Sequence, residues 1–124
     1  MPQINDDEAA RYVRWFSEVG SSDVKQVGGK NASLGEMTRE LGEAGIRVPT
    51  GFAVTAAAYR EFLEANDLPE RIADKLESFA RDEISLAGAG KSIRRLLRKA
   101  EFPTRIAHTI KEAYSELSSR AGKR

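Results

Sequence analysis

Two short stretches of strand-forming residues interrupt a chain whose apolar residues otherwise recur at helical spacing. In Tyr12–Phe16, aromatic and β-branched residues flank Arg14, and Phe52–Thr55 follows the turn residues Pro49 and Gly51. A sheet this small is not stable unless other elements pack on it. The sequence therefore predicts a helix-rich α/β (mixed α+β) fold with two or three short strands and about five helices.

Five segments carry the periodicity of amphipathic helices. The first follows Gly28-Gly29, with Asn31 or Ser33 as its expected N-cap, and should stop near Gly42 and Gly45. The second covers 56–64, the third has Pro69 in its first turn, the fourth has Ser85 as N-cap, and the fifth opens at Pro103. The residues expected to face inward are Leu34, Met37, Leu41, Tyr59, Phe62, Leu63, Ile72, Leu76, Phe79, Ala80, Ile93, Leu96, Leu97, Ala100, Ile106, Ile110, Ala113, Tyr114 and Leu117.

Length and composition narrow the class of protein. A chain of 124 residues suits one domain, and its 40% hydrophobic and 31% charged residues are ordinary globular values. No apolar run approaches the roughly 20 residues of a membrane span, and the acidic start of the chain does not resemble a signal peptide. The absence of Cys excludes disulfides, thiolate zinc sites and cysteine nucleophiles. We expect a cytoplasmic protein without a membrane partner.

Charge is distributed unevenly along the chain. Residues 1–90 carry 10 basic and 16 acidic side chains, whereas residues 91–124 carry 10 basic and 3 acidic ones. A basic C-terminal part can bind phosphate, anionic partners or nucleic acid. No aromatic residues interleave with these charges in the manner of single-strand binders, so a solvated basic face is favoured over a nucleic-acid site.

The strongest local motif is VGGKNASLGEM, from Val27 to Met37. The glycines Gly28 and Gly29 let the backbone come close to a ligand, and the helix that follows aims unpaired N–H groups at it. Lys30 adds a mobile positive charge suited to a phosphate. The motif fits a phosphate cradle, although Gly-Gly-Lys before a helix is also found in ordinary loops.

Other candidates are weaker. Gly90-Lys91-Ser92 matches the end of a P-loop, but Ser85 stands where the first glycine should be and helical periodicity runs through the segment. Arg94 and Arg98 share a helix face and could hold phosphate oxygens, or could simply be solvated. His108, the only histidine, has no metal-ligand or triad spacing and is interpreted as a surface residue.

Two further groups are expected to be structural. Trp15 and Phe16 could stack on a base, but an aromatic pair in a short strand more often packs in a core or an interface. Asp6, Asp7 and Glu8 could suggest a metal, but an acidic N-terminal tail is the commoner explanation. No residue is therefore assigned as a metal ligand or as a catalytic group.

Three segments in this order resemble the start of the phosphoenolpyruvate synthase (pyruvate, water dikinase) family. They are YVRWFSEVG, DVKQVGGKNASLGEM and VPTGFAVTAAAYREFL, and the likeness continues more weakly to KEAYSEL, so it covers about Tyr12 to Leu117. Pyruvate phosphate dikinases and rifampicin phosphotransferases share part of this frame. Asn31-Ala32-Ser33 is more similar to the synthases.

The resemblance implies an ATP-grasp-like nucleotide-binding domain. In this family, ATP phosphorylates a histidine on a separate domain, which carries the phosphoryl group to pyruvate held with Mg²⁺, giving phosphoenolpyruvate, AMP and phosphate. By position, Lys30 and Arg94 would contact ATP phosphates, and Gly28 and Gly29 would shape the loop. Positive, preorganised groups are what phosphoryl transfer requires.

The differences from the family limit the activity that we expect of this chain. Family enzymes are far longer than this chain. It does not match four of their features: the Arg-Ser-Ser strand, the magnesium-holding carboxylates, the phosphocarrier histidine and the barrel. His108 does not match the phosphocarrier histidine. We expect a flexible acidic segment over 1–11, part of the ATP-binding domain over 12–117, a flexible basic tail over 118–124, and no dikinase activity without the remainder, supplied in cis or in trans. The alternatives are a non-catalytic interaction module or part of a sister enzyme.

Overall fold

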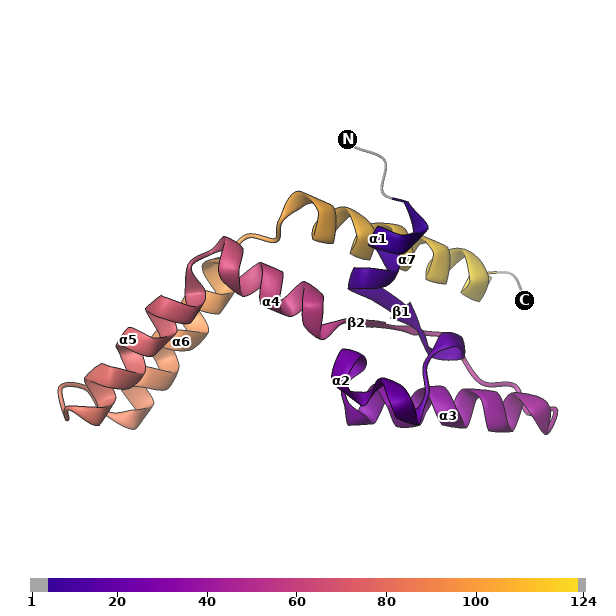
Figure 1. Cartoon of the computed structure of the whole chain (residues 1–124), viewed down its shortest axis with the longest axis horizontal. Coiled ribbons are helices and arrows are strands. Elements are labelled where there is room, and N and C mark those ends of the chain that lie inside the picture. The colour runs from indigo at the N-terminus through magenta and orange to yellow at the C-terminus, as the bar shows by residue number, and fades with distance from the viewer. Residues whose placement is uncertain (1–4, 123–124) are drawn as a thin grey trace. The chain divides into compact units, whose positions relative to one another are not determined.

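The computed structural model describes residues 5–122 and confirms a helix-rich α/β fold (Figure 1). Its described residues form seven α-helices, a two-stranded sheet and two 3₁₀ turns. In chain order they are α1 Asp6–Tyr12, β1 Val13–Trp15, η1 Phe16–Glu18, η2 Ser21–Asp23, α2 Val24–Val27, α3 Gly29–Glu43, β2 Phe52–Val54, α4 Ala56–Ala65, α5 Leu68–Ala80, α6 Leu86–Lys99 and α7 Thr104–Gly122.

The chain divides into two compact units, each described here by itself. Unit 1 comprises residues 1–59 and 104–124, and unit 2 comprises residues 60–103. The sheet lies in unit 1, where β1 and β2 pair antiparallel with Arg14 opposite Ala53. Both strands fall inside the segments that the sequence predicted.

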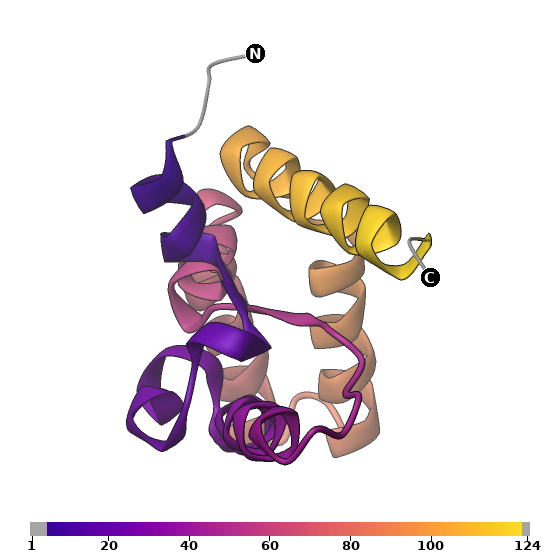
Figure 2. The same cartoon turned by 90° about the vertical axis from the view of Figure 1, so that its right-hand side faces the viewer.

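Unit 1 has two small clusters of buried side chains. One gathers Val19, Val27, Ala32 and Ala53, with Phe16 packed against it. The other gathers Tyr12, Ala58 and Ile106, with Ile110 beside it, where α7 meets α1 (Figure 2). The two clusters use residues from both ends of the chain, so α1 and α7 belong to the same unit as the sheet.

Helix α3 departs from the expected N-cap and the expected buried face. It begins at Gly29 with Gly28 as N-cap, so Asn31 and Ser33 lie inside the helix. Its buried residues are Ala32 and Gly35, whereas Met37 is 49% exposed. A Cβ on Gly35 would lie 2.2 Å from the Val19 carbonyl oxygen, so the small residues mark the face that meets η1 and η2.

The C-terminal end of α3 matches the expected stop. Gly45 has φ 81, its N–H donates to the Gly42 carbonyl at 3.1 Å, and the Ile46 N–H donates to the Leu41 carbonyl at 2.9 Å. These two hydrogen bonds form a Schellman motif, in which a glycine in the left-handed region ends the helix.

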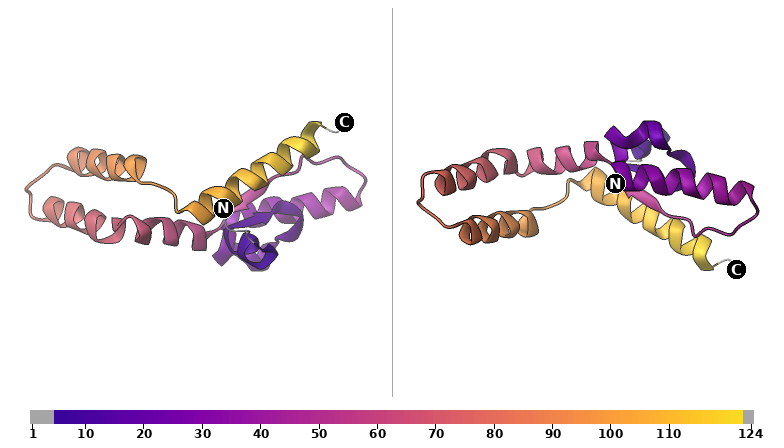
Figure 3. Two further views of the ribbon diagram at one scale, coloured as in Figure 1. Left: turned by 90° about the horizontal axis from the view of Figure 1, so that it is seen from above. Right: turned by 90° about the horizontal axis from the view of Figure 1, so that it is seen from below.

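Unit 2 is a helical hairpin in which α5 and α6 lie side by side (Figure 3). Its buried side chains are Phe62, Leu68 and Ala89, and the Asn66 amide exchanges hydrogen bonds with the Glu101 backbone at 2.8 and 3.1 Å. Ser85 caps α6 as expected, accepting from the Gly88 N–H. The Gly90-Lys91-Ser92 segment lies inside α6 and is not a P-loop.

Several residues expected to face inward are exposed. Phe62, Ile106 and Ala113 are buried as expected, but the exposed fraction exceeds one third for Tyr59, Leu76, Phe79 and Tyr114. Periodicity identifies the apolar stripe of a helix but not how much of that stripe a neighbour covers.

Helix α1 was not expected from the sequence, and α7 extends further than its apolar stripe indicated. Asn5 caps α1 by accepting from the Glu8 N–H at 2.8 Å, and α7 continues to Gly122. Residues 1–4, 123 and 124 of the proposed flexible ends lie outside the described residues. The division at residues 12 and 117 stays a prediction.

Candidate phosphate-binding site

The motif Gly28-Gly29-Lys30 lies at a sharp corner between two helices. Gly28 ends α2 by donating its N–H to the Val24 carbonyl at 2.7 Å, and its own carbonyl accepts from the Ala32 N–H at 3.0 Å, which starts α3. Its φ of 86 lies in the left-handed region that favours glycine. The Asn31 amide donates to the Val27 carbonyl at 2.8 Å and closes the end of α2.

This corner leaves the beginning of α3 open to a ligand. The first N–H groups of a helix have no partner within it, and no side chain caps α3. Gly28, Gly29 and Lys30 are exposed, and a Cβ built on either glycine would meet nothing within 4 Å. Among the described residues, Lys30 forms no ion pair. The backbone N–H groups of 29–31 and the Lys30 ammonium can therefore all reach one anion.

A network of polar contacts holds the loop before this corner. The Arg39 guanidinium donates to the Val19 carbonyl at 2.6 Å and to Glu36 Oε1 at 3.0 Å. The same Glu36 oxygen accepts from the Ser21 N–H at 2.8 Å. The Ser21 hydrogen bond lowers the pKa of Glu36 below its usual value; desolvation opposes this shift, and the nearby Arg39 charge adds to it. The sequence analysis did not identify this network.

Arg94, the other expected phosphate contact, lies on α6 in unit 2. It is exposed, and its guanidinium lies back along the helix, 3.1 Å from where a Cβ on Gly90 would be. It has no ion pair with a described carboxylate, and neither has Arg98. Gly28, Gly29 and Lys30 are together at one corner of unit 1, and their assignment with Arg94 to one site stays a prediction.

Other residues considered in the sequence have structural partners. Trp15 packs edge-on against Phe52, with ring centres 5.4 Å apart, and the Arg120 guanidinium lies 4.1 Å from the Trp15 ring centre. Glu8 pairs with Arg105 at 3.0 Å. These contacts account for the aromatic residue and for one of the three N-terminal carboxylates.

His108 is less exposed than a surface residue, because α1 packs near α7. Its side chain is 25% exposed and its Nε2 lies 3.8 Å from Glu112 Oε1. It lines a groove of about 470 Å³, whose other lining residues are Asp6, Ala9, Ala10, Val13, Trp15, Glu18, Thr109, Glu112, Ala113 and Glu116. This groove includes none of the residues predicted to bind phosphate.

Two further observations concern the part of the chain that the structure describes. No group of three or more His, Cys, Asp or Glu side chains there is placed to hold a metal ion. No helix in that part of the chain is long and apolar enough to cross a membrane.

Comparison with known proteins identifies the domain. Residues 24–124 match the family model described as "Pyruvate phosphate dikinase, AMP/ATP-binding domain". Phosphoenolpyruvate synthase of Neisseria meningitidis is 45% identical over 115 residues, which is 92% of this chain and 14% of that protein. The enzyme of the same name from Pseudomonas aeruginosa is 46% identical over 109 residues, 87% of this chain and 14% of that protein.

The likeness extends to more distant relatives. Phosphoenolpyruvate synthase of Escherichia coli is 38% identical over 117 residues, covering 94% of this chain and 15% of that protein. This chain thus spans about one seventh of the length of the curated relatives it matches. The resemblance seen in the sequence is confirmed, and the chain belongs to the pyruvate phosphate dikinase AMP/ATP-binding domain family.

Proposed function

We propose that this chain supplies the phosphate-binding end of an ATP site. The observation that carries the proposal is the uncapped start of α3, where Gly28 has φ 86 and the neighbouring Lys30 is exposed. The helix N-terminus and the ammonium group favour the same ligand, a group of negatively charged oxygens. The family match supports ATP or AMP as that ligand.

The reaction we propose is that of the named relatives, phosphoenolpyruvate synthesis from ATP, pyruvate and water with release of AMP and phosphate. In phosphoryl transfer, charge on the non-bridging oxygens must be neutralised, and Gly29, Lys30 and their N–H groups are suited to this. We assign no catalytic residue, because His108 does not match the family's phosphocarrier histidine and the groove it lines contains none of the residues predicted to bind phosphate. We derive no step through Mg²⁺ and assign no residue to hold it.

We further propose Arg94 as a second phosphate contact, contributed by α6. A guanidinium can hold two phosphate oxygens at once, and an arginine without an ion pair to a described carboxylate is available for this. The whole reaction would need the phosphocarrier and pyruvate-binding parts of a dikinase, in cis or in trans, and we expect it to occur in the cytoplasm.

The test is a titration of the isotopically labelled chain with ATP, followed by its amide NMR signals. We expect shifts at Gly28 to Ser33, and a loss of affinity on the order of tenfold to a hundredfold in Lys30→Ala, since a hydrogen bond to a charged group contributes about 1.5–3 kcal/mol.

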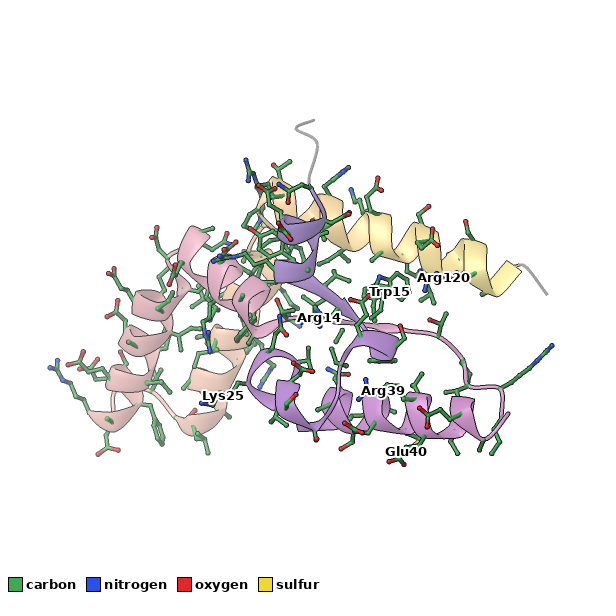
Figure 4. All side chains as sticks on the ribbon, turned by 45° about the vertical axis from the view of Figure 1, so that its right-hand side comes forward. Arg14, Trp15, Lys25, Arg39, Glu40 and Arg120 are labelled. Carbon is green, nitrogen blue, oxygen red and sulfur yellow. The ribbon has the colours of Figure 1, made fainter. Side chains whose placement is uncertain are left out.

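The matched control is Lys25→Ala. Lys25 is an exposed lysine on α2, less than two turns before Lys30 and outside the first turn of α3 (Figure 4). Lys25→Ala changes the net charge by the same amount as Lys30→Ala, so equal losses of ATP affinity in both variants would indicate a general electrostatic effect. ATP affinity unchanged in Lys30→Ala would refute the proposed site.

A further inference from the structure

One side chain joins the sheet to the short helix that precedes the glycine corner. Arg14, on β1, donates from Nη1 to Gln26 Oε1 at 2.6 Å and from Nη2 to the Glu18 carbonyl at 3.3 Å. Figure 4 shows Arg14 leaving the strand on the side where α2 lies. Gln26 stands two residues before Gly28, so the contact joins β1 to the start of the candidate site across twelve residues of sequence.

The strand end of this contact is rigidly placed. Arg14 pairs in the sheet with Ala53, which is buried in the cluster that also contains Val27. The Arg14 side chain is 22% exposed. Its Nε forms no hydrogen bond with a described residue, but it lies 3.9 Å from Glu18 Oε2 in an ion pair. This arginine is therefore oriented by hydrogen bonds from its two terminal nitrogens and by the Glu18 carboxylate beside the third.

The helix end, by contrast, is a single short turn, held by the Asn31–Val27 hydrogen bond and by its packing on η2 and α3. Helix α2 has four residues, too few to be stable by themselves. Val24 is 47% exposed, Lys25 is exposed, and Val27 is the buried residue of α2. One buried residue anchors such a helix but does not prevent rotation about its axis. The Gln26 hydrogen bond supplies a further attachment point on another side.

We propose that Arg14, acting through Gln26, is a positioning residue for the phosphate site. It fixes the rotation of α2, and with it the direction in which Gly28 leaves the helix and the N–H groups of 29–31 point. An anion then meets donors that are already oriented, which reduces the entropy cost of binding. This inference rests on the proposed function, since it assumes that ATP phosphates bind at the corner.

The experiment is a double-mutant cycle with Arg14→Met and Gln26→Met, measured as ATP affinity on the same NMR titration. Gln26→Met keeps the length of the side chain, Arg14→Met keeps the aliphatic part of it, and both remove the hydrogen bond. We expect each single variant to weaken ATP binding about three- to tenfold and the double variant to be no weaker than the single ones, because both lose the same contact. Arg14→Lys, which retains a donor, should recover part of the affinity.

A second readout separates positioning from stability. Amide hydrogen exchange without ATP should become faster at Gly28 and Ala32, whose N–H groups hydrogen-bond on either side of the corner, in both single variants, while protection in α7 stays unchanged. If Arg14→Met does not fold, Gln26→Met, at a partly exposed position, carries the test alone.

Three outcomes are distinguishable. Unchanged ATP affinity in Arg14→Met and Gln26→Met, with loss in Lys30→Ala, would overturn the positioning role and leave the phosphate site standing. Additive losses in the double variant would overturn it too, since the residues would then act independently. Unchanged affinity in Lys30→Ala would overturn both proposals.

Discussion

The two units of this chain are stabilised in different ways. In unit 1, buried side chains come from segments far apart in sequence, such as Tyr12, Ala58 and Ile106 in one cluster. In unit 2, the buried residues Phe62, Leu68 and Ala89 serve a single hairpin, supported by the Asn66–Glu101 clamp and by the tilted contact of Phe62 with Phe102.

The difference bears on function. Unit 1 presents its candidate ligand groups at a helix N-terminus, where backbone geometry and a buried cluster place them. Unit 2 presents Arg94 on an exposed helix face, where no ion pair with a described carboxylate holds it. Preorganised donors suit recognition of a phosphate, whereas an exposed arginine suits a contact made after the ligand has arrived.

The largest expected effect comes from cutting a cavity into each unit separately. Ile106→Ala and Leu68→Ala each truncate a side chain that is 0% exposed, and each should cost about 3 kcal/mol of unfolding free energy. Measured by amide hydrogen exchange, Ile106→Ala should reduce protection in β1, β2 and α7, and Leu68→Ala in α5 and α6. Equal loss across both units in either variant would show that the chain unfolds as one.

The next largest effect concerns the packing of α3 against the rest of unit 1. Gly35→Ala places a methyl group 2.2 Å from the Val19 carbonyl oxygen, a backbone atom that cannot move aside easily, and should cost about 2 kcal/mol of unfolding free energy. Its matched control is Gly42→Ala on the same helix, where a Cβ meets nothing within 4 Å and the change should stabilise by about 0.5 kcal/mol. Denaturant melts of both variants measure the two changes in unfolding free energy. Destabilisation by Gly42→Ala as large as that by Gly35→Ala would contradict the proposed close packing at Gly35.

The smallest effect is a pH dependence confined to unit 1. Because the pKa of Glu36 is lower in the folded chain than its usual value near 4.5, its contribution to stability is present above that value and is lost as the pH falls through the lower one. Thermal melts between pH 6 and pH 3, chosen to bracket the usual carboxylate range near 4, should show a smaller acid-induced drop in Glu36→Gln than in the unchanged chain.

The control for this experiment is Glu40→Gln. Glu40 is an exposed carboxylate on α3 that lies away from Arg39 (Figure 4). Glu40→Gln should show the same acid-induced drop in melting temperature as the unchanged chain. If Glu36→Gln and Glu40→Gln respond identically, Glu36 does not contribute the proposed pH-dependent stability.

Local patterns predicted much of the fold. Both strands, a helix at the Gly-Gly-Lys motif, the stop at Gly45 and the Ser85 cap were predicted from turn, cap and periodicity signals, although α3 begins at Gly29 rather than after the glycine pair. Helix α1 and the short α2 were missed, since acidic residues and a four-residue helix give almost no periodic signal. The buried face of α3 was also predicted wrongly, because Met37 is more hydrophobic than Gly35 but lies on the side that no described residue covers.

The sequence by itself determined that a flexible glycine corner precedes a helix with a lysine in its first turn, because backbone freedom and helix periodicity are properties of neighbouring residues. Only the tertiary structure decided that Gly28 is the N-cap of α3, that Gly35 faces Val19, and that Arg14 reaches Gln26. Each of these contacts depends on which segment packs against which, and residues many positions apart leave no mark of their pairing in a local pattern.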